Sequence, residues 1–234
     1  RTTGLRDREN VEFTSNHPLE PANFTPSFEA HRALLIDTRL TIKFGQKYYQ
    51  RPNLKYGTES KWPTLYVYYQ KGIKGVGNSL PNFDFLKVTI ADEIKLGLFG
   101  NSEFNIAYGG FLSKKNVPFI DAKHFMTTQT VFSNNSLTSF FNLPYYQLSS
   151  TEYFAEAHYE HHFAGFFFQN VPFLRKLKWQ VVAGSHFLYT DSTYEYLEVT
   201  AGIENIFRIG RVDWAMSRTH EREIAHSVRL RVGF

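Results

Sequence analysis

The chain ends, at residues 226–234, with His-Ser-Val-Arg-Leu-Arg-Val-Gly-Phe, in which apolar and polar side chains alternate from Val228 onward. Successive side chains of a β-strand face opposite sides of its sheet. A soluble protein would bury the apolar face of such a strand in a core, whereas an outer-membrane barrel would turn it to lipid and place the arginines in a polar lumen. The apolar face would carry Val228, Leu230, Val232 and Phe234, and the polar face Arg229 and Arg231.

Composition narrows the class of protein. Aromatic residues make up 17% of the 234 residues, including 23 Phe and 14 Tyr, yet the mean hydropathy is only −0.35. A helical membrane protein needs roughly 18 consecutive apolar residues, and the sequence has no such run. A transmembrane barrel fits both observations, because half of each strand is polar and aromatic residues gather at the membrane interfaces. A soluble all-β protein stays open at this point.

Charge and cysteine content exclude several functions. The net charge is +4, with Lys and Arg scattered among Asp and Glu rather than in a basic block, so we expect no nucleic-acid partner. The lack of cysteine excludes disulfides, thiolate metal sites and cysteine nucleophiles. The chain starts at Arg1 without an initiator Met or signal peptide, so we expect a mature or truncated product that lacks upstream strands.

About nine segments repeat the alternation of the last strand. The first is longer than the usual 5–6 residues of soluble strands and long enough for a tilted membrane crossing of about 9–11 residues. We therefore predict that residues 32–234 form the C-terminal part of an antiparallel transmembrane β-barrel. The predicted strands are 32–46, 62–72, 83–99, 102–113, 148–163, 177–190, 195–207, about 211–217, and 226–234.

The segments between these strands differ in length. Residues 1–31 lack alternation and are predicted to be an irregular segment or the tail of an upstream strand. Connections alternate between short ones, at 100–101 and 208–210, and longer ones, at 72–82, 114–146 and 218–223. Short turns on one side of the membrane and long loops on the other are typical of outer-membrane barrels. Segments 47–61 and 164–176 are exceptions to this alternation. Residues 114–146 are predicted to be a long extracellular loop or a plug that folds into the lumen.

The alternation also assigns individual side chains to the two faces. We expect seven apolar residues to face lipid: Ile36, Leu40, Ile42, Val212, Trp214, Leu230 and Val232. We expect eleven polar residues to face the lumen: Asp37, Arg39, Lys43, Glu156, His158, Glu160, His162, Arg211, Asp213, Arg229 and Arg231.

The lumen-facing residues allow more than one chemistry. Glu156, His158, Glu160 and His162 have side chains that could bind a metal, but a polar lumen wall is the favoured interpretation because no second ligand cluster is evident. No Gly-x-Ser-x-Gly sequence supports a nucleophile, so we predict no catalytic, cofactor or metal site. Six charged residues could form an ion-selective pore or a salt-bridge network in the lumen, and we favour the network: Arg39, Lys43, Arg211, Asp213, Arg229 and Arg231.

Several segments carry a resemblance to a known group of proteins. They are 15–23, His124-Phe125, Phe141-Asn-Leu-Pro-Tyr-Tyr146, Tyr159-Glu-His-His-Phe163 and Leu174-Arg-Lys-Leu-Lys-Trp179. With these, the chain resembles the C-terminal region of large Bacteroidota outer-membrane proteins called carboxypeptidase-like regulatory-domain proteins, a family of unknown function. The regulatory domain of that family is a separate N-terminal module, so the label implies no peptidase activity.

A more remote resemblance concerns the last strands. Residues 202–214 and the closing Val-Arg-Leu-Arg-Val-Gly-Phe234 are similar to the end of BamA/TamA-type barrels, the bacterial surface-antigen superfamily. This resemblance implies the second half of a 16-strand barrel, with 114–146 as its sixth extracellular loop and Phe234 as the outer-membrane sorting signal. The Val-Arg-Gly-Phe loop motif of that superfamily is absent.

Together these resemblances imply an integral, non-enzymatic protein of the bacterial outer membrane that acts in an envelope protein assembly or export complex. The expected partners are outer-membrane lipid and other subunits of that complex. Two alternatives stay open: a pore for passive or selective solute passage, and a soluble β-barrel that binds a hydrophobic ligand.

Overall fold

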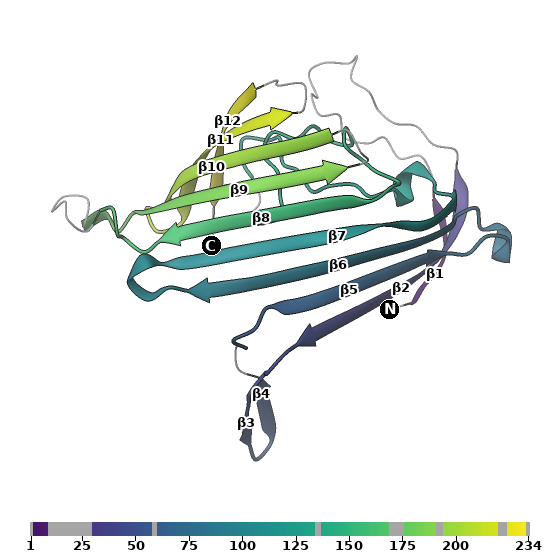
Figure 1. Cartoon of the computed structure of the whole chain (residues 1–234), viewed down its shortest axis with the longest axis horizontal. Helices are drawn as coiled ribbons and strands as arrows, with labels where there is room; N and C mark the ends of the chain where they lie inside the picture. The colour runs from purple at the N-terminus through teal and green to yellow at the C-terminus, as the bar shows by residue number, and fades with distance from the viewer. Residues whose placement is uncertain are drawn as a thin grey trace.

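The computed structural model describes residues 2–8, 30–57, 60–133, 137–168, 176–190, 194–219 and 224–232. Ten strands form one antiparallel sheet in which every strand pairs with its neighbours in the order β1-β2-β5-β6-β7-β8-β9-β10-β11-β12 (Figure 1). Their bounds are β1 Thr2–Arg8, β2 His31–Lys43, β5 Thr64–Gly72, β6 Asn82–Lys95, β7 Asn101–Asn116, β8 Phe154–Phe163, β9 Gln180–Thr190, β10 Tyr194–Ile206, β11 Gly210–Thr219 and β12 Ile224–Val232.

The remaining elements are short. Strands β3 (Tyr48–Arg51) and β4 (Leu54–Gly57) form a separate hairpin between β2 and β5. Three 3₁₀ turns lie in connections: η1 (Val76–Asn78), η2 (Gly97–Phe99) and η3 (Phe119–Asp121). No helix among the described residues is long and apolar enough to span a membrane.

The predicted all-β antiparallel architecture is confirmed, and each of the nine predicted strands has a counterpart. Strand β1 lies inside the segment 1–31, and the hairpin β3–β4 lies inside the predicted turn region 47–61. The prediction that a strand continues to residue 99 is wrong, because the chain reverses through Gly97 and Gly100, which have φ of 61° and 101°. Only glycine adopts such positive φ values without strain.

The long loop is longer than predicted at its C-terminal end and shorter at its start. Strand β7 extends to Asn116, and β8 begins only at Phe154. Residues 148–153 do not join β8, because Ser150 exchanges backbone hydrogen bonds with Lys123 in the same loop at 2.9 and 3.0 Å. We call the connection between β7 and β8 loop 117–153.

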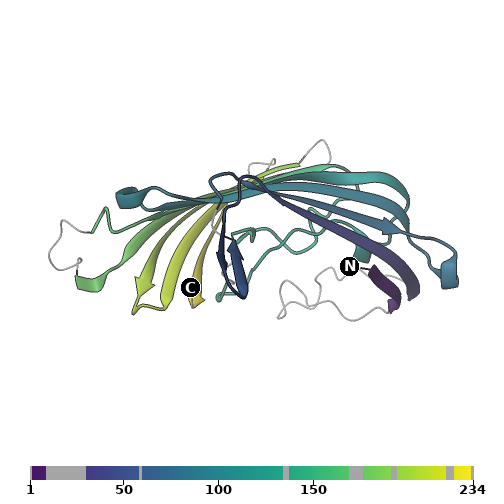
Figure 2. The ribbon, with the colours of Figure 1, turned by 90° about the horizontal axis from the view of Figure 1, so that it is seen from below.

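The sheet is an open arch, and its edges are β1 and β12 (Figure 2). Loop 117–153 lies beneath the arch, on the concave side (Figure 2). The loop also covers part of the β12 edge: Ser133 N–H donates to the Leu230 carbonyl at 2.9 Å, and Leu230 N–H donates to the Val131 carbonyl at 2.8 Å. Phe234, the predicted sorting signal, lies outside the described residues.

The convex face of the sheet is apolar and exposed. One unbroken row of directly paired residues crosses seven strands and contains only apolar side chains. Ile106, near its middle, has 51% of its surface exposed. The row consists of Ile42, Leu65, Ile90, Ile106, Ala157, Phe187 and Leu197.

The hydrophobic core lies on the concave face, between the sheet and loop 117–153. The loop contributes Phe125, Phe140 and Leu143 to it, and the sheet contributes Ala33, Leu35, Phe83, Phe85, Phe111, Phe154, Leu188 and Tyr196. One part of the concave face is therefore aromatic, which the expected polar lumen wall does not include. The charged residues of the last strands occupy the remainder of this face.

Candidate functional site: a buried ionic network

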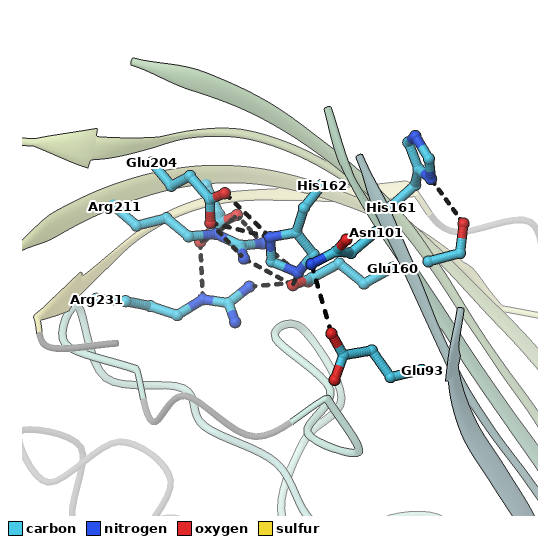
Figure 3. A network of polar contacts seen from close by, with 10 residues as sticks. Glu93, Asn101, Glu160, His161, His162, Glu204, Arg211 and Arg231 are labelled. Carbon is cyan, nitrogen blue, oxygen red and sulfur yellow. Dashed lines mark hydrogen bonds and ion pairs between the residues drawn. The ribbon is translucent and has the colours of Figure 1, made fainter. Parts of the chain in front are cut away.

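Six ionisable side chains from four strands meet on the concave face (Figure 3). Strand β8 provides Glu160 and His162, β10 provides Glu204, β11 provides Arg211 and Asp213, and β12 provides Arg231. These residues lie far apart in the chain, and the antiparallel register brings them together. We call them the ionic network.

Arg211 is at the centre of the ionic network. Its Nη1 and Nη2 atoms donate to the two carboxylate oxygens of Glu160 at 2.6 and 2.8 Å. Its Nε donates to Oδ1 and Oδ2 of Asp213 at 2.8 and 3.0 Å. This planar, two-pronged contact is the geometry that a guanidinium supplies and an ammonium does not.

The other members close the network around Arg211. The Nε of Arg231 donates to Asp213 Oδ2 at 2.8 Å, and its Nη2 lies 3.4 Å from Glu160 Oε2. His162 bridges two carboxylates, with Nε2 3.0 Å from Glu160 Oε1 and Nδ1 3.0 Å from Glu204 Oε2. When both nitrogens of His162 carry a proton, three cations balance three carboxylates.

Burial sets the energetic importance of these contacts. Arg211, Asp213 and Arg231 have 2%, 0% and 3% of their surface exposed. A buried charge is costly unless it is paired and hydrogen-bonded, and here each carboxylate faces at least one cation. The arrangement holds β8, β10, β11 and β12 together through side chains in addition to the backbone ladder.

A second polar pair lies on β8 and its neighbour β9. His158 of β8 and His186 of β9 are directly paired in the sheet, and their Nδ1 atoms lie 2.9 Å apart. One ring must donate and the other accept, so the accepting imidazole is neutral. Both Nε2 atoms are buried without a hydrogen-bond partner among the described residues, and the ring of Phe140 packs against both histidines.

The structure offers no geometry for a metal site at the four alternating residues of β8, which are Glu156, His158, Glu160 and His162. Their side chains share the concave face as expected, but Glu156 pairs with Lys87 at 2.7 Å, and Glu160 and His162 belong to the ionic network. Among the described residues, no group of three or more His, Cys, Asp or Glu is arranged to hold a metal ion.

The other predicted polar residues are dispersed. Asp37 is half-buried and accepts hydrogen bonds from Tyr68 Oη and Gln70 Nε2, both at 2.8 Å. Arg39 and Lys43 are exposed on β2, away from the ionic network. Arg229 is half-buried and donates to the Phe141 carbonyl at 2.8 Å.

The predicted lipid-facing residues lie on the convex face. Ile36, Leu40, Val212, Trp214 and Val232 are exposed, and Ile42 and Leu230 are half-buried. Their positions agree with the alternation of their strands. Their contact with lipid stays a prediction.

Glu198 holds loop 117–153 against the sheet. Its carboxylate is fully buried and accepts the backbone N–H groups of Phe141 and Asn142 at 2.9 and 2.8 Å. The same carboxylate accepts a hydrogen bond from the Tyr196 hydroxyl at 2.8 Å. The sequence indicates that Glu198 points inward, but its role as the anchor of the loop was not predicted.

A second contact of the loop is ionic. Lys123 Nζ lies 3.7 Å from Glu156 Oε2 and over the rings of Phe125 and Phe154 at 4.6 and 5.2 Å from their centroids. Burial lowers the pKa of Lys123 to about 8, although the Glu156 carboxylate opposes this shift. The loop therefore places a partly desolvated cation in the centre of the concave face.

A cavity of about 420 Å³ adjoins the ionic network. Glu160, His162, Glu204, Arg211 and Arg231 line it from the sheet, and Leu137 lines it from loop 117–153. The cavity is polar on the sheet side and bounded by the loop on the other.

Comparison with known proteins matches the chain to one family model. Residues 1–203 match the C-terminal domain of a family of unknown function, DUF5686. The chain belongs to the DUF5686 family. No curated protein and no solved structure matches it.

The first resemblance, to the C-terminal region of a family of unknown function, is supported to that extent by the match. The comparisons give no support to the likeness to BamA/TamA-type barrels or to the carboxypeptidase-like label. Glu160 and His162 of the ionic network fall inside the matched residues, whereas Glu204, Arg211, Asp213 and Arg231 follow residue 203.

Proposed function

We propose that this DUF5686 domain is the C-terminal part of a bacterial outer-membrane β-barrel whose lumen is filled by loop 117–153. The observation that carries the proposal is the distribution of side chains between the two faces of the sheet. The convex face is an exposed apolar surface that continues across seven strands, whereas the concave face contains buried charged residues. Lipid outside and a polar interior reproduce this distribution.

The open arch fits a barrel that needs further strands. The sheet has two edges, β1 and β12, and among the described residues no further strand pairs with either edge, although Val131 and Ser133 bond to Leu230. A sheet inside a membrane must close, because lipid offers no hydrogen bonds to an edge strand. A 16-strand barrel, in which this sheet supplies ten strands and the rest of the protein supplies six, is consistent with this requirement.

Gel mobility of the full-length, detergent-extracted protein tests the barrel. Folded outer-membrane barrels resist the detergent in the gel, so we expect faster migration of the unboiled sample than of the boiled sample. A protein that is soluble without detergent and shows no mobility shift would contradict the proposal. That result would favour the soluble barrel with a hydrophobic ligand.

The proposed biological role is non-enzymatic and lies in envelope protein assembly or export. In support, the ionic network pairs its acids with cations instead of leaving a group poised for proton transfer, and loop 117–153 occupies the concave side. We expect reduced levels of other outer-membrane proteins when the full-length protein is depleted. Normal outer-membrane assembly in a deletion strain would refute this role.

A solute pore is the second candidate, because the cavity of about 420 Å³ is lined by charged side chains. Under the plugged-barrel proposal, we expect the full-length protein to be nearly non-conducting in planar bilayers. Glu198→Ala removes the acceptor of two loop N–H groups and of the Tyr196 hydroxyl. Each buried donor that loses its partner costs about 1–3 kcal/mol, so we expect the loop to detach and conductance to appear.

The matched control for this experiment is Glu195→Ala. Glu195 lies on the same strand, but its side chain is exposed on the convex side. Glu195→Ala also removes a carboxylate but leaves every contact of the loop in place, so we expect no change in conductance. Steady conductance by the unmodified protein would overturn the plugged barrel and establish the pore.

A further inference from the structure

The hairpin β3–β4 projects from the end of the sheet at the connection between β2 and β5 (Figure 1). All eight of its strand residues are exposed, and it forms a separate two-stranded sheet. A two-stranded hairpin alone in water is marginally stable at best. A surface that covers one of its faces would stabilise it.

The two faces of the hairpin differ in chemistry. Tyr49 pairs directly with Tyr56, and Arg51 pairs with Leu54 on the same face. Tyr49 is 72% exposed and Leu54 58% exposed. The opposite face carries Tyr48, Gln50 and Lys55, and the Lys55 ammonium lies 4.4 Å from the centroid of the Tyr48 ring. The first face thus presents two tyrosines and a leucine beside one arginine, all of them open to the surroundings.

Segment 43–62, which contains the hairpin, carries the net charge of the whole chain. Five of the 26 Lys and Arg residues lie in it, but only one of the 22 Asp and Glu residues, so the remaining chain has 21 of each. The cations alternate with aromatic residues instead of forming a run, which is why no basic block is visible in the sequence. The five are Lys43, Lys47, Arg51, Lys55 and Lys61.

The base of the hairpin adjoins the apolar convex face. The row of apolar residues begins with the pair Ile42 and Leu65, and exposed Phe44 and Trp62 follow at the ends of the same strands. The base is ordered: Ser60 Oγ donates to the Phe44 carbonyl and accepts the Trp62 N–H at 3.0 Å. The hairpin therefore starts where the proposed lipid-facing surface ends.

We propose that the hairpin β3–β4 docks on the headgroups of anionic phospholipids, with Tyr49, Leu54 and Tyr56 in the membrane interface. Tyrosine and tryptophan favour this region because their rings are amphipathic, and lysine and arginine near the surface are attracted to anionic headgroups. The inference rests on the proposed barrel, which places the base of the hairpin at the membrane boundary. The hairpin would fix the position of the barrel relative to one leaflet.

Site-specific fluorescence in vesicles tests the docking, and these 234 residues contain no cysteine that would compete for the label. Bimane is attached to Leu54→Cys, Gln50→Cys or Ile106→Cys in the full-length protein, in vesicles of phosphatidylcholine with or without phosphatidylglycerol. Lipids with a spin label near the headgroup quench a bimane that reaches the interface. Gln50 is the matched control, because it lies on the opposite face of the same hairpin.

We expect bimane at position 54 to be quenched more than at position 50, and about twofold more strongly when phosphatidylglycerol is present. The triple substitution Lys47→Glu, Arg51→Glu and Lys55→Glu should abolish that dependence on anionic lipid. Two results would overturn the docking, provided that Ile106 is quenched by chain-labelled lipid: equal quenching at positions 50 and 54, or no quenching at 54. Either result would instead favour a protein partner for the face that carries Tyr49, Leu54 and Tyr56.

The label at Ile106 separates this inference from the proposed barrel. A loss of quenching at Ile106 with continued quenching at 54 would refute the barrel and retain the lipid contact. A loss at both positions would refute both proposals.

Discussion

Substitution of Ile106 by arginine is expected to prevent stable assembly of the full-length protein in membranes. Ile106 lies in the middle of the convex row, between Ile90 and Ala157 on the neighbouring strands. Its side chain is already 51% exposed, so no core packing explains a large effect. An arginine at the lipid-facing midplane of a barrel costs about 2–4 kcal/mol, whereas an ordinary surface substitution in a soluble protein changes stability by about 0.5 kcal/mol or less.

The matched control is Val76→Arg. Val76 is 57% exposed in η1, a connection outside the strands, so the chemical change and the exposure are similar. Denaturation of the protein in lipid vesicles, followed by intrinsic fluorescence, measures the free energy of unfolding of both variants. Equal stability of Ile106→Arg and Val76→Arg would show that the convex face meets water, and the barrel proposal would fall.

The position of Ile106 on the apolar face could be predicted because a strand alternates with a period of two. On the same strand, the polar residues Glu103 and Asn105 occupy the alternate positions, so the two faces of the strand are distinguishable in the sequence. The aromatic core could not be predicted in the same way. At Phe85-Leu86 and Phe111-Leu112 both faces carry apolar residues, so alternation gives no information about which side is buried.

The sequence predicts a salt-bridge network in the lumen, but it does not predict which residues of the ionic network contact each other. Alternation places Glu160, Arg211 and Arg231 on inward faces, and the antiparallel order of the last strands makes their proximity plausible. The role of Glu198 is different. Its partners are backbone N–H groups of Phe141 and Asn142, 57 and 56 residues away in an irregular loop, and no local pattern in a sequence encodes such a contact.

The hairpin β3–β4 was missed for a related reason. Its strands have only four residues each, which is too short for alternation to be recognised. The turn between them, Pro52-Asn53, is a common turn signal, but it fits a simple loop equally well.

Substitution of Arg211 by methionine is expected to cause the second large effect. Methionine keeps much of the volume and removes the guanidinium that binds Glu160 and Asp213. Removal of one partner of a buried ion pair costs about 3–5 kcal/mol, because the remaining charge stays buried without compensation. We therefore expect a large decrease in the denaturant midpoint of the full-length protein in vesicles.

Two further variants make this experiment specific. Arg39→Met removes an arginine from an exposed position of the same face, and we expect little change. The double substitution Arg211→Met with Glu160→Gln removes both charges of the strongest pair, so it should be less destabilising than Arg211→Met alone.

The size of the Arg211→Met effect also reports on the state of the lumen. Beneath an ordered loop 117–153 the network is dry, and the cost stays near the value for a buried pair. In a water-filled channel the same pair would be screened, and its removal would cost about 1 kcal/mol or less. A small effect of Arg211→Met, equal to that of Arg39→Met, would therefore argue for an open pore. A large effect that becomes smaller when Glu198→Ala is also present would show that the loop excludes water from the network.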